Sequence, residues 1–346
     1  MAVNTKTAVM TKLQARLSPR WIAALVVVIL AFLLPTIIHN DYYIRVAITM
    51  CIWGVLCVGF RLMFLAGEMN VGLPAFMAIG AYSGALLMVK AHWNWWLAVL
   101  VAAAMPAVVA LILGRIVLRV KGAYFAILNF GFLMVVRHVW LAWPKWFGGG
   151  AGISNIPSPN AIGGWHFGSL PSFFYLGLCL LVLTIIVFYR LEKSKYGLTM
   201  KAMGQADMLT EAVGVNIMRY KLAAFVLCAL FSGVVGCYFA SVQHFIDPEE
   251  FTFLPSLYLV LYPVVGGLMS FRGPIWGVVF LMALPIGLKE IPGYDPKIEP
   301  IIFGSILVVV MLFLPSGLVS LPARAMALYN KLRKVRPKEV EEYAAP

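Results

Sequence analysis

Residues 190–221 read RLEKSKYGLTMKAMGQADMLTEAVGVNIMRYK and separate two apolar runs, 172–190 and 220–240, each long enough to cross a membrane. This polar insert holds six basic and three acidic residues: Arg190, Lys193, Lys195, Lys201, Arg219 and Lys221, with Glu192, Asp207 and Glu211. Its apolar residues are spaced for one or two short amphipathic helices. We therefore expect the insert to leave the membrane and to lie on the surface of another protein.

The composition predicts the fold class. Apolar residues make up 62% of the 346 residues, charged residues only 12%, and the mean hydropathy is +0.91. Such a chain has lipid as its main solvent. We expect an all-α, polytopic integral membrane protein. The net charge of +13 is not gathered in one patch, so membrane topology explains it better than nucleic-acid binding does.

Ten membrane spans of about twenty residues are expected. They lie near 21–38, 44–64, 73–90, 95–116, 122–143, 172–190, 220–240, 252–270, 273–290 and 299–319. An even number of spans places both termini on one side of the membrane. If that side is the cytoplasm, most lysines and arginines lie there, as the positive-inside rule requires.

The expected organisation has three parts. Residues 1–20 form a basic cytoplasmic tail, 21–320 form the transmembrane domain with the insert at 191–219, and 321–346 form a second cytoplasmic tail. The first apolar run is predicted to be an uncleaved helix, because it is long, has no small-x-small cleavage site and leads directly into further spans.

Within the insert, Gly197 and Gly204 are expected to mark the limits of two short helices. Asp207 is expected to cap the second helix, which reads MLTEAV, and Gly214 takes the usual position after a helix end. The insert is thus predicted to form a helix–turn–helix.

The stretch YGLTMKAMGQADMLTEAVGVNIMRYKLAAFVLCALFSGVVGCYFA, residues 196–240, resembles permeases of ATP-binding-cassette importers. The resemblance is to the branched-chain amino-acid importer permease family, of the M-subunit type, which is related to urea and amide importer permeases. Three further stretches, at 67–87, 121–159 and 259–279, follow in the family's order. Together they spread the resemblance from about residue 45 to 320.

The resemblance implies a permease subunit that imports a branched-chain amino acid, or a related small polar or organic substrate, by alternating access. Its implied partners are a second homologous permease, two cytoplasmic ATPase subunits, an external substrate-binding protein and membrane lipid, at a bacterial-type inner membrane. Within the insert, Glu211, Ala212 and Gly214 match positions of the family's coupling loop. The full set of implied ATPase-coupling residues is Gly197, Lys201, Gly204, Asp207, Glu211, Ala212 and Gly214.

The ATPase motor is expected on separate chains. The sequence contains no G-x-x-x-x-G-K-[ST] loop to cradle phosphates. The run GGGAG at 148–152 lacks the following Lys-Ser/Thr and is interpreted as a flexible cover near the pore entrance. We therefore expect no enzymatic site and no cofactor on this chain, with ATP and Mg²⁺ bound by the partner subunits.

Two interrupted spans are candidates for the substrate pathway, because non-helical backbone survives in a membrane only where it faces protein or a wet cavity. They are FLAGEMNVGLPAF at 64–76, in which Pro74 is expected to open the next helix, and YPVVGGLMSFRGP at 262–274. The alternative is close helix packing, since glycines recur at small-xxx-small spacing: Gly80 with Gly84, and Gly273 with Gly277.

Polar residues at membrane depth are further pathway candidates: Glu68, Asn70, Asn129 and Arg137 join Gly266 and Gly267 of the second interrupted span. Arg137 is favoured for an anionic group, either Glu68 at rest or a substrate carboxylate during transport. Its alternative place is the external interface, beside Trp140 and Trp143. Glu68, Asn70 and Pro74 stand where the family commonly has Gln, Ser and His, so the substrate stays open among amino acids, urea, short amides and small organic acids.

Two other classes of protein are considered. An ion-gradient-driven transporter or channel is disfavoured because few buried acids offer ion sites. An integral membrane enzyme would need a compact set of titratable groups, which the scattered histidines do not supply. One acidic cluster, formed by Asp247, Glu249 and Glu250, is expected in an external loop as a solvated rim or as a docking surface for a binding protein.

Overall fold

The computed structural model describes residues 32–36, 40–161, 164, 167–289, 298–313 and 317–321, and the expected all-α architecture is confirmed for them. The main helices are α3 (Asp41–Leu65), α4 (Leu73–Val89), α5 (Trp95–Val117), α6 (Ala123–Ala142), α8 (Leu170–Lys193), α9 (Lys195–Gln205), α10 (Asp207–Ala212), α11 (Ile217–Gln243), α12 (Phe253–Gly266), α13 (Gly273–Lys289) and α14 (Glu299–Phe313). The short elements are α7 (Pro144–Phe147), η1 (Gly149–Ala151), β1 (Ile153–Ser154), β2 (Phe245–Ile246), η2 (Pro248–Glu250) and η4 (Leu318–Ser320).

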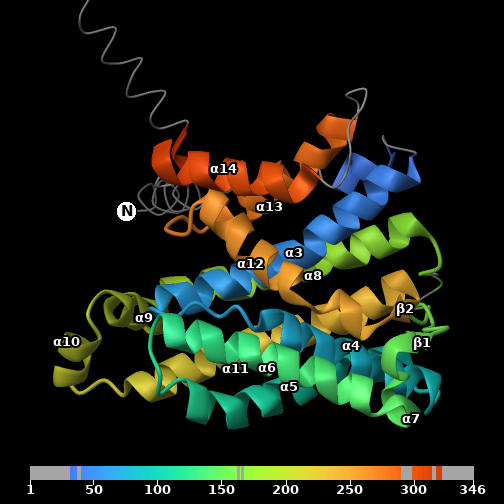
Figure 1. Ribbon diagram of the computed structural model, residues 1–346, viewed down its shortest axis with the longest axis horizontal. Coiled ribbons are helices and arrows are strands. Elements are labelled where there is room, and N and C mark those ends of the chain that lie inside the picture. The colour runs from blue at the N-terminus through green and yellow to red at the C-terminus, as the bar shows by residue number, and fades with distance from the viewer. Residues whose placement is uncertain are drawn as a thin grey trace, which may run out of the picture.

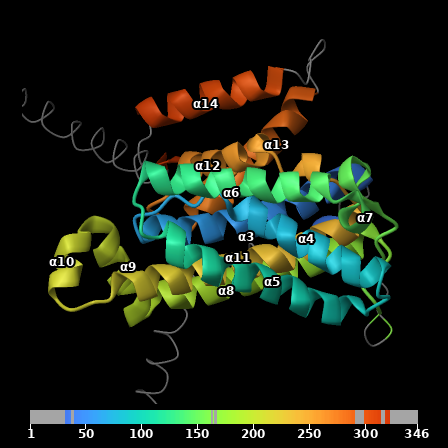
Figure 2. The same cartoon turned by 60° about the horizontal axis from the view of Figure 1, so that its bottom comes forward.

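The long helices run along one common direction, which gives the molecule two distinct ends (Figure 1). Helices α9 and α10 project at one end, whereas α7 and the antiparallel pair β1–β2 lie at the other. The turned view in Figure 2 places α14 on the outside, beside α12 and α13. Any site near α10 is therefore separated by the length of the bundle from any site near β2.

Five helices of the described chain are long and apolar enough to cross a membrane: α3, α5, α6, α8 and α11. Helices α4 and α13 are shorter apolar helices. The predicted spans that fall on described residues match helices whose bounds mostly differ by a few residues. The span predicted at 21–38 lies largely outside the described residues, so the total of ten stays a prediction.

One predicted span was too long. The segment 252–270 is helical only as far as Gly266, because Gly267 adopts a left-handed backbone angle (φ 113°) that ends α12. The span predicted at 299–319 corresponds to α14 (Glu299–Phe313), beyond which residues 314–316 lie outside the described residues.

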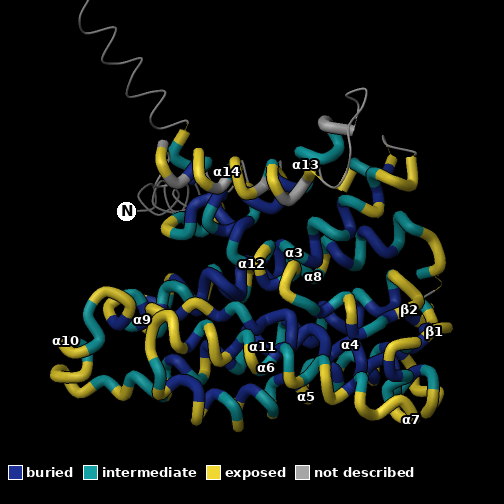
Figure 3. The backbone as a smooth tube through the Cα atoms, viewed as in Figure 1, coloured by how far each residue is buried: buried dark blue, intermediate teal, exposed yellow. Residues whose placement is uncertain are grey.

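Two helices form the centre of the bundle. In the most apolar segment of α3, 72% of residues are buried inside the chain, and in that of α11, 56%, against 22–33% in α5, α6 and α8. Figure 3 shows this buried interior and the exposed residues at α10 and at α7. The outer helices therefore present apolar side chains to lipid or to partner subunits.

Small residues bring α4, α11 and α5 into backbone contact. A Cβ atom added at Gly80 would lie 2.3 Å from the carbonyl oxygen of Gly233, and one added at Gly236 would lie 1.9 Å from that of Met77. A Cβ at Gly233 would in turn lie 2.1 Å from the carbonyl oxygen of Ala102. This close approach gives the packing that helices use in lipid, where the hydrophobic effect does not hold them together.

We predict that Gly80→Ala destabilises the bundle. The added methyl group would overlap backbone atoms of α11, and such overpacking costs about 1–3 kcal/mol. The measurement is the apparent melting temperature in detergent. Gly131→Ala is the matched control, because Gly131 lies on an exposed part of α6 where an added Cβ atom meets nothing within 4 Å. Equal melting temperatures for the two variants would contradict this packing.

Candidate functional site

The polar insert forms two short helices at one end of the bundle, α9 and α10 (Figure 1). Gly197 and Gly204 were predicted to mark the ends of two short helices, and this was wrong because both lie inside α9. An added Cβ at Gly197 would lie 2.4 Å from Cα of Glu192, and one at Gly204 would lie 2.3 Å from the carbonyl oxygen of Leu65. These glycines let α9 pack closely on the ends of α8 and α3.

The end of α10 matches the prediction, but its start does not. Gly214 has φ +88°, and the hydrogen bonds from Gly214 N–H to the Glu211 carbonyl and from Val215 N–H to the Thr210 carbonyl close the helix in a Schellman motif. Asp207 does not cap α10: the N-cap is Ala206, which makes no side-chain cap bond. The Asp207 carboxylate instead binds two lysines.

Three large apolar residues on and just after α10 face outward. Met208, Leu209 and Val213 are 85%, 71% and 84% exposed. Among the expected coupling residues, Glu211 and Ala212 are exposed beside them, and Lys201 lies on α9. Exposed apolar side chains gathered in one place are typical of surfaces that contact another protein, a membrane or a ligand.

The first interrupted span begins with a fixed turn. Gly67, at φ +85°, follows α3 in a second Schellman motif, with hydrogen bonds from Gly67 N–H to the Phe64 carbonyl and from Glu68 N–H to the Met63 carbonyl. Pro74 lies in the first turn of α4, as expected. The turn directs Glu68 back into the protein, where it is 1% exposed.

A buried ion network joins Glu68 to the insert. Lys221 on α11 lies 2.9 Å from the Glu68 carboxylate and 3.3 Å from that of Asp207. Lys121, in the connection between α5 and α6, lies 2.8 Å from Asp207, and the backbone N–H of Gly122 donates to Glu68. This network thereby connects α10, α11, the α3–α4 turn and the α5–α6 connection.

The charges in this network support one another. Burial opposes ionisation of Asp207, but hydrogen bonds and charges from Lys121 and Lys221 outweigh it and hold the pKa of Asp207 below its usual range. The hydrogen bond to Asp207 raises the pKa of Lys121. Both groups are therefore charged at neutral pH.

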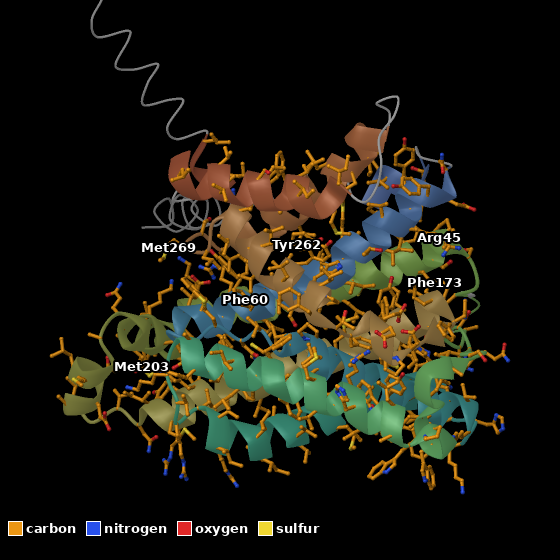
Figure 4. The ribbon with its side chains drawn as sticks, viewed as in Figure 1. Arg45, Phe60, Phe173, Met203, Tyr262 and Met269 are labelled. Carbon is orange, nitrogen blue, oxygen red and sulfur yellow. The ribbon has the colours of Figure 1, made fainter. Side chains whose placement is uncertain are left out.

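A second ion network joins the insert to the other interrupted span. Arg61 on α3 forms a two-pronged pair with Glu192 at the end of α8, and Lys201 on α9 lies 2.7 Å from the same carboxylate. Arg61 also donates to the carbonyl oxygens of Leu268 and Met269, in the turn between α12 and α13. Figure 4 labels Met269 at this turn and Phe60, the neighbour of Arg61, on α3.

The sequence did not predict either network. Glu192 and Lys221 were counted only as charges of the insert, and Arg61 and Lys121 were assigned no role. The one available signal was that each stands at or near the end of an apolar run, where a charge is costly unless it finds a partner.

The predicted pathway residues lie in different places. Asn70 and Asn129 are fully buried on either side of Gly72, where an added Cβ would lie 2.9 Å from Cβ of Asn129. Asn70 Oδ1 accepts from Gly72 N–H and Asn129 Nδ2 donates to the Phe125 carbonyl. The Asn70 Nδ2 and Asn129 Oδ1 atoms have no hydrogen-bond partner among the described residues.

Arg137 does not pair with Glu68. It pairs with Glu249 of η2, at the end of the bundle that carries β2, and Trp140 lies one turn further along α6. The neighbouring Glu250 is partly buried, and this burial together with the charge of Asp247 raises the pKa of Glu250 to about 7.

Gly266 and Gly267 serve close packing in this structure. An added Cβ at Gly266 would lie 1.9 Å from the Gly273 carbonyl oxygen, and one at Gly277 would lie 1.8 Å from that of Tyr262. The turn that they form is the one held by Arg61.

Residues 42–312 match the model of one protein family, described as branched-chain amino acid transport system / permease component. The chain belongs to this family. The match covers all of the helices that make up the two networks.

Individual relatives agree with this assignment. The chain is 32% identical over 292 residues to the high-affinity branched-chain amino acid transport system permease protein LivM of Escherichia coli (strain K12), over 78% of this chain and 68% of the relative. It is 32% identical to LivM of Salmonella typhimurium over 277 residues, or 74% and 64%. It is 26% identical over 199 residues to the guanosine ABC transporter permease protein NupQ of Bacillus subtilis, or 51% and 59%. No solved structure matches the chain.

We predict that Lys221→Met destabilises the protein strongly. Removing one member of a buried ion pair leaves the other charge uncompensated, at a cost of about 3–5 kcal/mol. The double variant Lys221→Met/Glu68→Gln removes both charges and should regain much of the loss. The measurement is thermal unfolding in detergent, with Arg219→Met, an exposed position on the same helix, as control. A Lys221→Met protein as stable as this control would contradict the buried network.

Proposed function

We propose that the chain is the permease subunit of an ATP-binding-cassette importer that carries a branched-chain amino acid or a related small polar substrate. It works by alternating access and is powered by separate ATPase subunits. Membership of the permease family supports this proposal. The LivM relatives, whose alignments span about two thirds of their own length, support the substrate class.

The observation that carries the coupling part of the proposal is the exposed apolar surface of α10. Met208, Leu209 and Val213 project from a segment rich in charge, beyond the ends of the apolar helices. Lipid does not explain this exposure, because the basic and acidic residues around it keep α10 out of the hydrocarbon core. A protein surface explains it, and we assign that surface to an ATPase subunit.

The two ion networks give the insert a mechanical link to the pathway. The Asp207–Lys221–Glu68 contacts connect α10 to the turn between α3 and α4. The Lys201–Glu192–Arg61 contacts connect α9 to the turn between α12 and α13. A movement of the insert driven by ATPase closure would therefore displace both interrupted spans together.

The proposed topology follows from this assignment. The end with α9 and α10 faces the cytoplasm of a bacterial-type inner membrane, as both termini do, and the end with β1 and β2 faces outward. The complex contains a second homologous permease, two ATPase subunits and an external substrate-binding protein. ATP and Mg²⁺ bind to the ATPase subunits, because the sequence has no phosphate-cradling motif.

Docking on α10 predicts that Leu209→Asp together with Val213→Asp releases the ATPase subunits. The new charges would have to be buried in the contact, whereas Leu209→Met keeps its apolar character. The measurement is co-purification from membranes, scored for the ATPase subunits and the second permease separately. Retention of the ATPase subunits by the double variant would exclude α10 as their docking surface.

Glu211→Lys is predicted to uncouple transport from ATP hydrolysis without unfolding the permease. The side chain is exposed on α10, so reversing its charge changes the contact surface and not the core. The measurement is the ratio of substrate imported to ATP hydrolysed in proteoliposomes, with the melting temperature as a control for folding. Normal uptake at a normal ratio would remove Glu211 from the coupling element.

A further inference from the structure

The end of the chain opposite α10 carries a cluster of charged and aromatic side chains drawn from several elements. Arg137 and Trp140 come from α6, Tyr82 from α4, and Glu249 and Glu250 from η2. Arg137 binds Glu249, and the Tyr82 ring stacks on that of Trp140 at a centroid distance of 4.1 Å. Phe251 directly follows η2, and its ring centroid lies 6.3 Å from that of Trp140, which places this turn against α6.

The backbone around the cluster is held in place. Strands β1 and β2 pair through Ile153 and Ile246, and Gly152 lies so close that an added Cβ would meet the Ile246 carbonyl oxygen at 2.2 Å. The Asp247 carboxylate caps η2 by accepting from the N–H of Glu250. The acids of η2 therefore lie on a defined turn, with Glu249 exposed and with Asp247 and Glu250 half-buried.

Three polar atoms in the cluster are buried and have no hydrogen-bond partner among the described residues. They are the Tyr82 hydroxyl, Nε of Arg137 and Oε2 of Glu250. The Tyr82 side chain is the most deeply placed, since the residue is 1% exposed. Buried polar atoms without partners are costly, so their gathering in one place points to a ligand that supplies the missing hydrogen bonds.

The unpaired atoms differ in what they can bind. Arg137 keeps one guanidinium edge for a carboxylate, because Glu249 occupies only Nη2. Glu250 and the Tyr82 hydroxyl offer oxygen acceptors for an ammonium group. The rings of Trp140, Phe147 and Phe251 lie beside them, with the latter two each 6.3 Å from Trp140. A guanidinium, an acid and an aromatic wall match a zwitterion with an apolar side chain.

We propose that this cluster is an entry site for an apolar α-amino acid, in which Arg137 binds the α-carboxylate and Glu250 with Tyr82 binds the α-ammonium group. The side chain of the amino acid packs on the aromatic wall. Glu249 holds Arg137 through Nη2 and competes with the substrate carboxylate for the charge of the guanidinium group. This inference rests on the proposed function, because it places a substrate-binding site at the end of the permease that is proposed to face outward.

The test is equilibrium binding to the purified complex in nanodiscs, without binding protein, using three ligands. Leucine carries both charged groups, 4-methylpentanoate lacks the ammonium group, and 3-methylbutylamine lacks the carboxylate. Arg137→Met should weaken leucine and 4-methylpentanoate about tenfold or more and leave 3-methylbutylamine unchanged. Glu250→Gln should weaken leucine and 3-methylbutylamine and leave 4-methylpentanoate unchanged.

Two control variants separate recognition from structure. Glu249→Gln frees Arg137 and should tighten leucine binding, which a merely structural Glu249 would not do. Lys145→Met, at an exposed cation on α7, should change nothing.

Several results would overturn the proposal: no leucine binding at millimolar concentration, unchanged leucine affinity in Arg137→Met, or equal loss of all three ligands. If Arg137→Met leaves the affinity for leucine unchanged but abolishes uptake that depends on the binding protein, the cluster is a docking surface for that protein instead. Recovery of the ATPase subunits and their ATP hydrolysis are scored on the same preparations, so failure of this site and failure of the proposed function are distinguishable.

Discussion

The arrangement of this permease depends on the need to pair charges that are buried at the end of an apolar helix bundle. Lys221 and Glu68 are both almost completely buried, and neither charge is tolerable there without the other. Because Lys221 also binds Asp207, the start of α10 is tied to α11 and to the turn after α3. The insert is therefore part of the folded bundle, and its position cannot change without moving the turn that carries Glu68.

The second network likewise pairs buried charges at this end of the bundle. Arg61 binds Glu192 with two nitrogens and the α12–α13 turn with two more hydrogen bonds, while Lys201 brings α9 to the same carboxylate. Both interrupted spans are thus linked to the insert, whereas α4, α5 and α11 are locked together by backbone contact at Gly80, Gly233 and Gly236. Closely packed helices beside two turns that are tied to the insert are the kind of division that alternating access would use.

Local sequence rules predicted the helices and one helix end well, and failed where partners are distant in the chain. Apolar run length predicted most helix bounds, and the preference of glycine for a left-handed angle predicted Gly214. The pairs Arg61–Glu192, Lys221–Glu68 and Arg137–Glu249 join residues more than a hundred positions apart, so periodicity holds no trace of them. Asp207 was also misjudged: a local capping role was expected, but Lys121 from the α5–α6 connection and Lys221 from α11 bind its carboxylate. Gly197 and Gly204 were read as helix breaks because the sequence does not show which helices they touch.

The most direct measurement is an affinity pull-down of the tagged chain from its native membrane, followed by mass spectrometry of the proteins that remain bound. If α9 and α10 form the docking element of an ATP-driven permease, two ATPase subunits and a second, similar permease will be recovered with the chain. Recovery of the chain alone, or only as a homodimer, would contradict that role and favour a transporter driven by an ion gradient.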